Sequence, residues 1–248
     1  MSIPSLSDVT VILVEPQSPG NIGMVCRAMA NFGAADLRLV NPCHHLHPEA
    51  RKFAVGASSL LGSARIFPDL TSAVADLHMT IATTRRRGRL RGQLLDISAV
   101  PALRSELPSA ARMGLVFGRE DAGLTSEETA LCSHAATVNT SAEIGSLNLA
   151  QAVLLFLYEL ARQPVTTSPA LREIAEQGEV EPLFEQMESV LTRIAFLNSK
   201  RPENVMTPLR HILRRAELNR NEVQLLRGMW SQLAWSIRDW RGRKRGED

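Results

Sequence analysis

Apolar residues follow two different spacings along the first part of the chain. Short apolar runs alternate with stretches whose apolar residues recur every three to four positions, up to about residue 160. The runs predict strands and the recurring positions predict helices. The expected strands are Val9–Val14, Leu37–Val40, Ala64–Phe67, Met79–Ala82, Gly114–Phe117 and Ala136–Val138. The expected helices are Gly20–Phe32, Asp69–Leu77, Ser126–Leu131 and Leu147–Arg162.

This alternation of strands and helices predicts an α/β fold, with a mostly parallel sheet covered by helices on both faces. In such sheets, ligands bind beyond the carboxyl ends of the strands. The loops that follow the strands are therefore the segments in which candidate functional residues are expected.

The hydrophobic pattern changes after Arg162, where the strand signal disappears. Gln163-Pro-Val-Thr-Thr-Ser-Pro169 is rich in turn-forming residues and predicts a linker. Helical spacing then predicts helices over Leu183–Leu197 and from Asn221 to about Trp240, with another starting at Thr207-Pro208. We therefore expect a sheet domain over residues 1–163, a linker over 164–179 and an all-α extension over 180–248.

The composition is that of an ordinary globular protein, but the positive charge is unevenly distributed. The 248 residues are 44% apolar and 22% charged, with a net charge of +2. Five arginines lie within the seven residues from Arg85 to Arg91, and Arg241–Arg245 is a second basic segment. Such runs are often only solvated surface, but clustered arginine also suits contact with a polyanion such as nucleic acid.

The cysteines and the N-terminal residues both favour a cytoplasmic protein. Cys26, Cys43 and Cys132 are odd in number and far apart, which argues against a disulfide framework. The first eight residues lack the basic and apolar parts of a signal peptide. The longest apolar run, around Val153–Leu157, is far too short to cross a bilayer, so no membrane association is expected.

The first candidate motif is the glycine turn that follows the first strand. Gly20-x-x-Gly23 could belong to a dinucleotide site, but it lacks the Gly-x-Gly-x-x-Gly spacing. The second strand also ends in Asn41-Pro42, where a dinucleotide fold places an acidic residue for the ribose. The alternative is a tight turn into a buried helix, with Arg27 on the exposed side.

Two later strand–loop–helix segments contain polar residues. Gly118, after the strand that ends at Phe117, permits close approach of a ligand to the backbone, and Glu120 follows it in the turn. Thr125 and Glu128 form a capping box for the next helix. A polar loop from residue 138 then leads into a helix with Ser146 and Asn148 in its first turn. Loops with free backbone amides can hold an adenosine without needing a phosphate.

Taken together, three motifs resemble the SPOUT-class RNA ribose 2′-O-methyltransferases of the TrmH type. They are Asn21-x-Gly-x-x-x-Arg27-Ala, Phe117-Gly-x-Glu120-x-x-Gly-Leu-Thr125 and Ser146-Leu-Asn148-Leu-Ala. The segments Arg193-Ile-Ala-Phe-Leu, Leu209–Leu218 and Leu226-Arg-Gly228, with Glu222, are similar to the helical extension of bacterial tRNA methyltransferases that act on nucleotide 32. The resemblance spans nearly the whole chain.

The resemblance implies a fold that hydrophobic periodicity cannot indicate. The parallel sheet of this class contains a deep trefoil knot, which here is expected to include residues 118–162. The class also forms homodimers, with each active site built where two protomers meet.

The cofactor that the resemblance implies is S-adenosyl-L-methionine. Its expected contacts are Thr83, Thr84, Arg85, Gly118, Val138, Gly145, Ser146 and Leu147. The resemblance assigns Arg27 to the ribose hydroxyl, either as a base or as an electrostatic clamp. A guanidinium is a poor base at neutral pH, since its pKa exceeds about 12.

The resemblance gives the remaining motif residues supporting roles. Asn21, Ser146 and Asn148 are expected to position Arg27 and the ribose, and Glu120 to orient the arginine or a neighbouring loop. Gly20 and Gly23 are expected to clear space so that Asn21 and Arg27 face the RNA.

The arginine run lies beside this expected site, where the tRNA backbone would pass. Its candidate RNA-binding residues are Arg86, Arg87, Arg89 and Arg91. Cys43-His-His-Leu-His47 matches no standard zinc spacing, so no metal is expected. Trp230, Trp235 and Trp240 wind around a helix, which disfavours a base-stacking platform, and Trp230 is expected in the core or a dimer contact.

We expect a tRNA ribose 2′-O-methyltransferase that modifies cytidine or uridine at position 32. An rRNA 2′-O-methyltransferase of the same class and a non-catalytic RNA-binding protein on the same scaffold are the alternatives. The intact motif residues argue against the second alternative. The short segment before the first strand and the C-terminal extension favour tRNA over rRNA.

Overall fold

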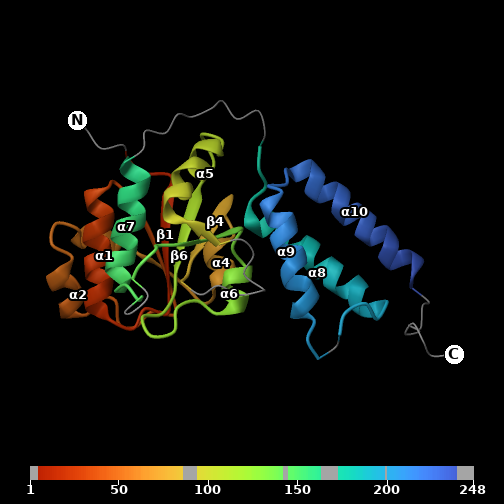
Figure 1. Cartoon of the computed structure of the whole chain (residues 1–248), viewed down its shortest axis with the longest axis horizontal. Helices are drawn as coiled ribbons and strands as arrows, with labels where there is room; N and C mark the ends of the chain where they lie inside the picture. Colours follow the sequence, from red (N-terminus) through yellow and green to blue (C-terminus); the bar gives the residue numbers. More distant parts are fainter. Residues whose placement is uncertain (1–4, 86–93, 142–144, 163–172, 199, 239–248) are drawn as a thin grey trace.

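The computed structural model describes residues 5–85, 94–141, 145–162, 173–198 and 200–238. Within them, seven strands and the helices beside them form the first part of the chain, and three helices form the second (Figure 1). The strands are β1 (Val9–Val14), β2 (Asp36–Val40), β3 (Arg65–Phe67), β4 (Met79–Thr83), β5 (Leu94–Asp96), β6 (Met113–Phe117) and β7 (His134–Thr137). The helices of the first part are α1 (Pro19–Asn31), α2 (Pro48–Phe53), α3 (Ser58–Gly62), α4 (Leu70–Val74), α5 (Val100–Glu106), α6 (Ser126–Ala130) and α7 (Leu149–Arg162), with a short 3-10 helix at Ile97–Ala99.

The strands form one parallel sheet in the order β3-β2-β1-β6-β4-β7-β5. This confirms the predicted α/β fold with a parallel sheet. Because β1, β6, β4 and β7 are consecutive neighbours, the loops that follow them open beside one another at the carboxyl edge of the sheet. The polar motifs of the sequence lie in three of these loops.

Some elements differ from those expected. β7 begins two residues and ends one residue earlier than the apolar run at Ala136–Val138 indicates, and β5, α2, α3 and α5 were not predicted. These four elements have only three to seven residues, so they contain too few positions for a periodic apolar pattern. In short elements the tertiary contacts decide the conformation.

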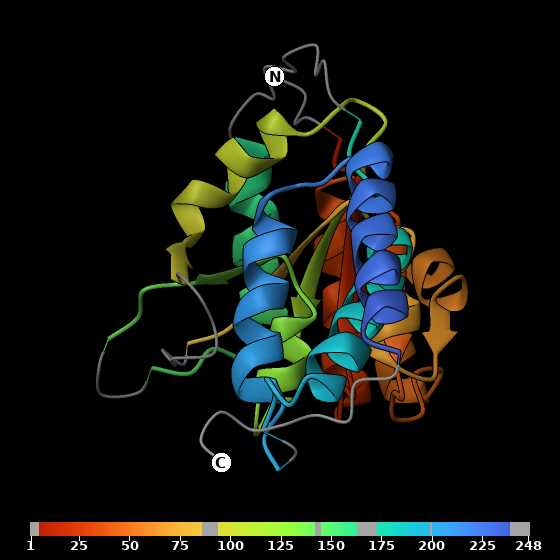
Figure 2. The same ribbon diagram turned by 90° about the vertical axis from the view of Figure 1, so that its right-hand side faces the viewer.

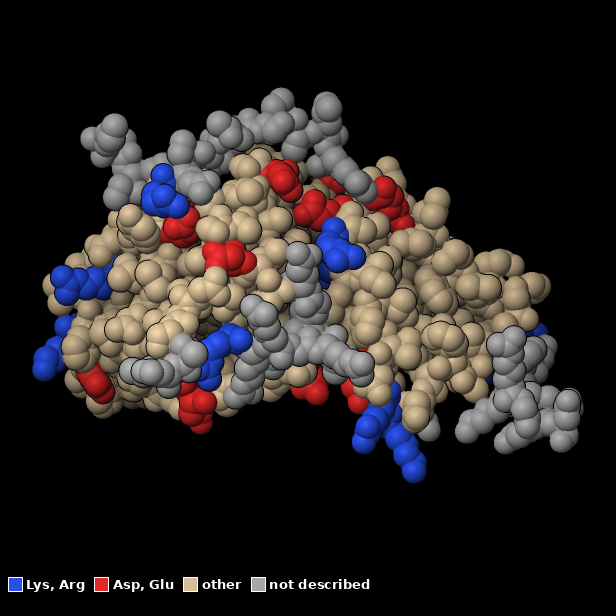
Figure 3. All heavy atoms as spheres, in the orientation of Figure 1, with Lys and Arg blue, Asp and Glu red and all other residues tan. Residues whose placement is uncertain are grey.

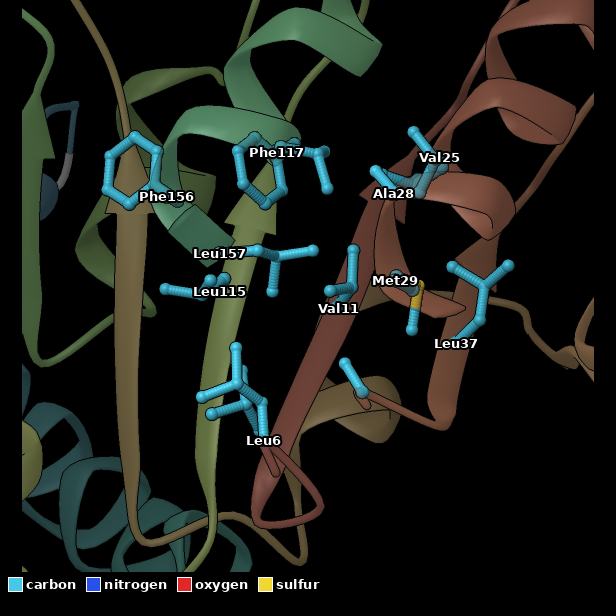
Figure 4. Packing of buried hydrophobic residues seen from close by; sticks show 14 of the residues in the cluster. Leu6, Val11, Val25, Ala28, Met29, Leu37, Leu115, Phe117, Phe156 and Leu157 are labelled. Atoms are coloured by element: carbon cyan, nitrogen blue, oxygen red, sulfur yellow. The ribbon is translucent and has the colours of Figure 1, made fainter. Parts of the chain in front are cut away.

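Two helical layers enclose the sheet (Figures 1 and 2). Helices α1, α2, α3, α5 and α7 lie on one side, while α4 and α6 lie on the other, with the C-terminal helices packed outside them. Side chains alternate along β1, since Val11 belongs to the core under α1 and α7 and Ile12 to the core under α4. Figure 4 shows the first of these cores, where Phe117 and Phe156 pack edge to face with ring centroids 5.7 Å apart.

The resemblance to the SPOUT class implies a knot in this part of the chain. β7 is inserted between β4 and β5, and α7 then packs against α1 and α5. The threading of the knot stays a prediction.

The glycines at the start of α1 serve the packing of α2. A Cβ at Gly23 would lie 2.2 Å from the carbonyl oxygen of Ala50, and one at Gly20 would lie 2.8 Å from Oε1 of Glu49. The expectation that these glycines clear space for RNA is therefore wrong. Gly23 allows the backbone of α2 to approach α1 more closely than any larger residue would permit, whereas Gly20 faces the movable end of the Glu49 side chain.

The C-terminal part consists of α8 (Gln177–Arg193), α9 (Glu203–Arg215) and α10 (Arg220–Ser236), which share a core of their own. Trp230 packs against this core, as expected. The prediction that α9 starts at Thr207-Pro208 is wrong, because Pro208 lies inside the helix. Met206, two residues before this proline, is buried, and burying a methionine offsets part of the cost of an interior proline. Within the described residues, no helix is long and apolar enough to span a membrane.

An ion-pair network around the buried Arg38 ties β1, β2, β3 and α4 together at the amino end of the sheet. Arg38 is fully buried and donates to Asp36 at 2.9 Å and to Asp76. Asp36 also accepts hydrogen bonds from Arg65 at 2.7 Å and from Thr10 at 2.8 Å. Burial opposes the charge of Asp36, but the hydrogen bonds from Arg65, Arg38 and Thr10 outweigh it and lower the pKa of this carboxyl to about 2.

This lowered pKa predicts a loss of stability in acid. The carboxyl of Asp36 titrates near 2 in the folded protein and near its ordinary value of 3.8 in the unfolded chain. Its stabilisation is therefore complete above about pH 4 and is lost as the pH falls towards 2, and it amounts to about 2 kcal/mol. In urea unfolding experiments at pH 3–7, Asp36→Asn should lower the free energy of unfolding at pH 7 by at least about 2 kcal/mol and should weaken its pH dependence below pH 4.

The control for this prediction is Glu106→Gln, which removes an exposed carboxylate at the end of α5. It should leave both the stability and its pH profile close to those of the unmodified protein. An Asp36→Asn variant with the same acid profile as the unmodified protein would contradict the prediction.

Candidate active site

A cleft of about 200 Å³ opens at the carboxyl edge of the sheet, where the loops after β4, β6 and β7 meet the start of α7. Its apolar wall includes Phe117, Leu149 and Phe156, and hydroxyl groups and loop backbone surround the rest. A second hollow of about 280 Å³ adjoins the cleft along the loop after β7. The two hollows share Arg85, Thr137, Val138, Thr140 and Gly145.

All eight residues that the resemblance assigns to the cofactor line this cleft. They are Thr83, Thr84, Arg85, Gly118, Val138, Gly145, Ser146 and Leu147. They come from loops far apart in sequence, which meet because β6, β4 and β7 are neighbours in the sheet. The hydroxyl of Thr83 is already engaged, since it donates to the carbonyl oxygen of Val116 at 2.9 Å.

Gly118 is needed by the fold of its own loop. A Cβ at this position would lie 2.2 Å from the carbonyl carbon of Gly123, so the close neighbour is the chain itself. The turn is closed by a hydrogen bond of 2.8 Å from the backbone N–H of Gly123 to the carbonyl oxygen of Arg119. Gly118 also lines the cleft, so its expected role in allowing a ligand close to the backbone stays a prediction.

Glu120 joins the loop after β6 to the start of α1. Its carboxylate accepts hydrogen bonds from the backbone N–H groups of Gln17 at 2.9 Å and Ser18 at 3.1 Å. It also accepts one from Nδ2 of Asn21 at 2.9 Å. Of the two roles expected for Glu120, this geometry matches the orientation of a neighbouring loop, because no hydrogen bond or ion pair joins it to Arg27 within the described residues.

Asn21 extends this network to α7. Its side-chain oxygen accepts a hydrogen bond of 2.9 Å from Nδ2 of Asn148. The side-chain oxygen of Asn148 accepts in turn from the backbone N–H of Ala150 at 2.8 Å. Glu120, Asn21 and Asn148, which lie in different motifs, therefore form one continuous chain of hydrogen bonds.

Arg27 and Ser146 are both exposed, but they lie in different places. Ser146 lines the cleft, whereas Arg27 projects from α1 and does not line it. In the part of the chain that the structure describes, no hydrogen bond or ion pair engages the Arg27 guanidinium. Within a single protomer, hydrogen bonds thus connect Asn21 to Glu120 and to Asn148, whereas Arg27 lies outside the cleft.

Arg119 is a site residue that the sequence analysis missed. Its guanidinium donates to Glu15 at 2.8 Å and to both carboxylate oxygens of Glu128 at 3.0 Å, and these bonds raise its pKa further. Glu128 also accepts from the backbone N–H of Thr125 in the predicted capping box. The available signal in the sequence was a charged residue close after each of two strands, Glu15 after β1 and Arg119 after β6. Only the pairing of β1 with β6 shows that these two residues lie side by side.

The candidate RNA-binding residues Arg86, Arg87, Arg89 and Arg91 lie outside the described residues. Their neighbour Arg85 is exposed at the edge of the cleft. On the face shown in Figure 3, the basic side chains are scattered among acidic ones, and the C-terminal helices present a largely uncharged surface. Among the described residues there is no cluster of three or more His, Cys, Asp or Glu side chains that could hold a metal ion.

The Glu120 network leads to a prediction about the cleft. In Glu120→Gln, a neutral amide replaces the acceptor of two backbone N–H groups and of Asn21, so the start of α1 should loosen. The free energy of unfolding should fall by about 1–3 kcal/mol. Hydrogen exchange at the amides of Gln17 and Ser18 should become faster.

The neighbouring Asp121→Asn is the matched control, because Asp121 is exposed and contacts only the side chain of Gln17 among these groups. It should change stability by less than about 0.5 kcal/mol. Equal exchange rates at Gln17 and Ser18 in the Glu120→Gln variant and the unmodified protein would disprove the predicted role.

Comparison with known proteins identifies the family. Residues 8–158 match the SpoU rRNA methylase family, and residues 178–245 match the C-terminal domain of the tRNA methyltransferase TrmJ. The chain is 34% identical to the tRNA (cytidine/uridine/adenosine-2′-O-)-methyltransferase TrmJ of Pseudomonas aeruginosa, over 92% of this chain and 94% of that protein. It is 37% identical to the uncharacterized tRNA/rRNA methyltransferase LasT of Escherichia coli, over 75% of this chain and 82% of that protein.

A solved structure agrees with these relatives. The crystal structure of TrmJ from Z. mobilis superimposes with a TM-score of 0.81 at 35% identity, covering 90% of this chain and 98% of that one. Both the sheet part and the helical part are therefore shared with TrmJ proteins. The chain belongs to the SpoU methylase family, as the three motifs around Asn21, Glu120 and Asn148 had indicated.

Proposed function

We propose that this protein is an S-adenosyl-L-methionine-dependent tRNA ribose 2′-O-methyltransferase that modifies cytidine or uridine at position 32. The observation that carries the proposal is the combination, in one chain, of the family's sheet part with the TrmJ C-terminal domain. Relatives that share both parts along most of their length are named as tRNA (cytidine/uridine-2′-O-)-methyltransferases. The position 32, the cytoplasmic location and the domain limits at residues 163 and 180 remain predictions from the sequence.

The chemistry of the cleft fits S-adenosyl-L-methionine. Phe117, Leu149 and Phe156 offer an apolar wall for an adenine ring, and the adjoining loop offers backbone groups and hydroxyls for the polar parts. Gly145 has a left-handed φ of +55°, and a Cβ there would lie 2.0 Å from Nη1 of Arg85. A glycine at position 145 therefore suits both the left-handed backbone and the present position of the Arg85 side chain.

When bound, this cofactor supplies a methyl group on a positively charged sulfur. The residues of the chain must hold the ribose hydroxyl in line with that methyl and stabilise the oxygen as it loses its proton. Arg27 suits the second task as an electrostatic clamp, because a guanidinium is a planar cation that can bind a phosphate and a developing alkoxide. Asn21 and Asn148, fixed by Glu120, hold the start of α1 against the start of α7, and Ser146 lies at the edge of the cleft.

The position of Arg27 supports a homodimer. Arg27 lies outside the cleft of its own chain, and α7 exposes Leu154, Leu155 and Tyr158, with Tyr158 52% exposed. An apolar helix face of this kind, beside an exposed arginine, suits an isologous contact between two copies. We propose that Arg27 of one protomer completes the cleft of its partner.

The central test is methyl transfer. Purified protein with labelled S-adenosyl-L-methionine and unmodified tRNA should place the label on the ribose of nucleotide 32. Arg27→Ala should lower the rate by about 100-fold or more, since removing a single transition-state contact has such effects, while cofactor binding by calorimetry stays unchanged. Label on a base, label only on rRNA, or full activity of Arg27→Ala would each disprove part of the proposal.

A mixing experiment tests the shared active site. Ala122 is exposed and lines the cleft, so Ala122→Trp should obstruct the cofactor without disturbing the core. Arg27→Ala and Ala122→Trp should each be inactive alone. Co-expressed with different tags and purified through both tags, they should form heterodimers in which about half of the sites are intact. Heterodimers without activity, beside an active unmodified dimer, would show that each chain uses its own Arg27.

A further inference from the structure

Arg214 of α9 lies between the C-terminal helices and the sheet part of the chain. Its side chain is only 2% exposed. Nη1 donates a hydrogen bond of 3.0 Å to the carbonyl oxygen of Ala130, the last residue of α6, and Nη2 donates one of 2.9 Å to Glu181 of α8. In both ribbon views α9 lies beside α6 (Figures 1 and 2).

A charged residue is an unusual choice for this buried position. Burial lowers the pKa of Arg214 to about 10, so the guanidinium is still protonated at neutral pH and must be neutralised by Glu181. Its buried Nε makes no hydrogen bond within the described residues. Replacing a buried ion pair by apolar side chains of similar volume is often neutral or stabilising. What the arginine adds is the hydrogen bond that fixes the end of α6.

Helix α6 connects two walls of the cleft. The loop 118–124, which lines the cleft, leads directly into α6, and β7 carries the chain from α6 to the loop that begins at Val138. At the start of α6, Glu128 both closes the capping box and binds Arg119. Arg119 is the neighbour of Glu120. A shift of α6 would therefore move both walls of the cleft.

The C-terminal helices are also hydrogen-bonded to the sheet part at the start of α8. The backbone N–H groups of Gln177 and Gly178, at the start of α8, donate to the carbonyl oxygens of Leu77 at 2.9 Å and Ala75 at 2.8 Å. A Cβ at Gly178 would lie 3.0 Å from the carbonyl oxygen of Ala75, so the contact is close. The helices are thus attached to the loop before β4 as well as to α6.

We propose that Arg214 is a positioning residue for the cofactor cleft. Through the carbonyl oxygen of Ala130 it holds α6, and with it the loop 118–124, in the arrangement that the cleft requires. The identity of the ligand rests on the proposed methyltransferase function. The C-terminal helices then support the cleft in addition to any contact they make with tRNA.

The experiment compares two arginines that both contact Glu181 and Phe184. Arg210 donates to Glu181 at 2.6 Å and lies over the ring of Phe184, as Arg214 does. Of these two arginines, Arg214 alone has a hydrogen bond to α6 within the described residues. In Arg214→Met, Glu181 keeps Arg210 as its partner, and the methionine fills the apolar space. Arg210→Met removes an equivalent charge from the helices and leaves the bond to Ala130 intact, so it is the matched control.

Two readouts separate positioning from general stability. Calorimetric titration with S-adenosyl-L-methionine, without tRNA, should show about tenfold weaker binding for Arg214→Met, as expected for the loss of a charge-assisted hydrogen bond, and less than twofold for Arg210→Met. Hydrogen exchange in the ligand-free protein should be at least about fivefold faster over residues 118–131 in Arg214→Met only. If Arg214→Met does not fold, Arg214→Lys serves the same test, because it keeps the charge but not the paired planar donors.

Unchanged cofactor affinity and unchanged exchange in the Arg214 variant would overturn the proposal, as would equal effects in the Arg210 variant. If the unmodified protein does not bind S-adenosyl-L-methionine, the proposed function fails instead. The exchange comparison over residues 118–131 then still decides whether Arg214 positions the loop.

Discussion

The carboxylate of Glu120 binds parts of the chain that lie about a hundred residues away in sequence, and the arrangement of the candidate site depends on this contact. It accepts two backbone N–H groups at the start of α1 and the side chain of Asn21, which in turn binds Asn148 at the start of α7. A carboxylate with three donors is a strong and directional acceptor, because each bond is assisted by its charge. The loop after β6 and the first turns of α1 and α7 therefore hold one another in place.

This contact is possible because of the strand order. β6 lies between β1 and β4, so the loop that contains Glu120 opens between the loop after β1 and the loop after β4. The contact with the loop after β1 fixes the start of α1. The loop after β4, on the other side, brings Thr83 and Arg85 to the cleft. Glycines adapt the loops to this crowding, since Gly118 and Gly145 lie where a Cβ would collide with the backbone of Gly123 and the side chain of Arg85. The cleft is thus formed by the topology and not by any single loop.

The C-terminal helices are attached to the sheet part at two places, at the loop before β4 and at the end of α6. Both places lie on the side of the sheet opposite α1 and α7. Among the described residues, the C-terminal helices therefore do not cover α1 and α7, the surface on which we propose that a second copy of the chain packs. This division agrees with the proposed roles of Arg27, which projects from α1, and of Arg214, which lies in α9.

Hydrophobic spacing alone determined the parallel α/β architecture and the separate helical part, because long buried strands and amphipathic helices leave periodic patterns. The motifs around Asn21, Glu120 and Asn148 identified the family, since three short segments in a fixed order form a specific signal. Spacing could not locate β5, α2, α3 or α5, which are too short for a period, and it misplaced the start of α9 because a proline also occurs inside helices. Only the tertiary structure decided that Gly23 admits α2, that Glu120 binds a loop instead of Arg27, and that Arg119 and Arg214 support the cleft. These contacts join residues that are distant in sequence, and they exist only once the strand order has brought their segments together.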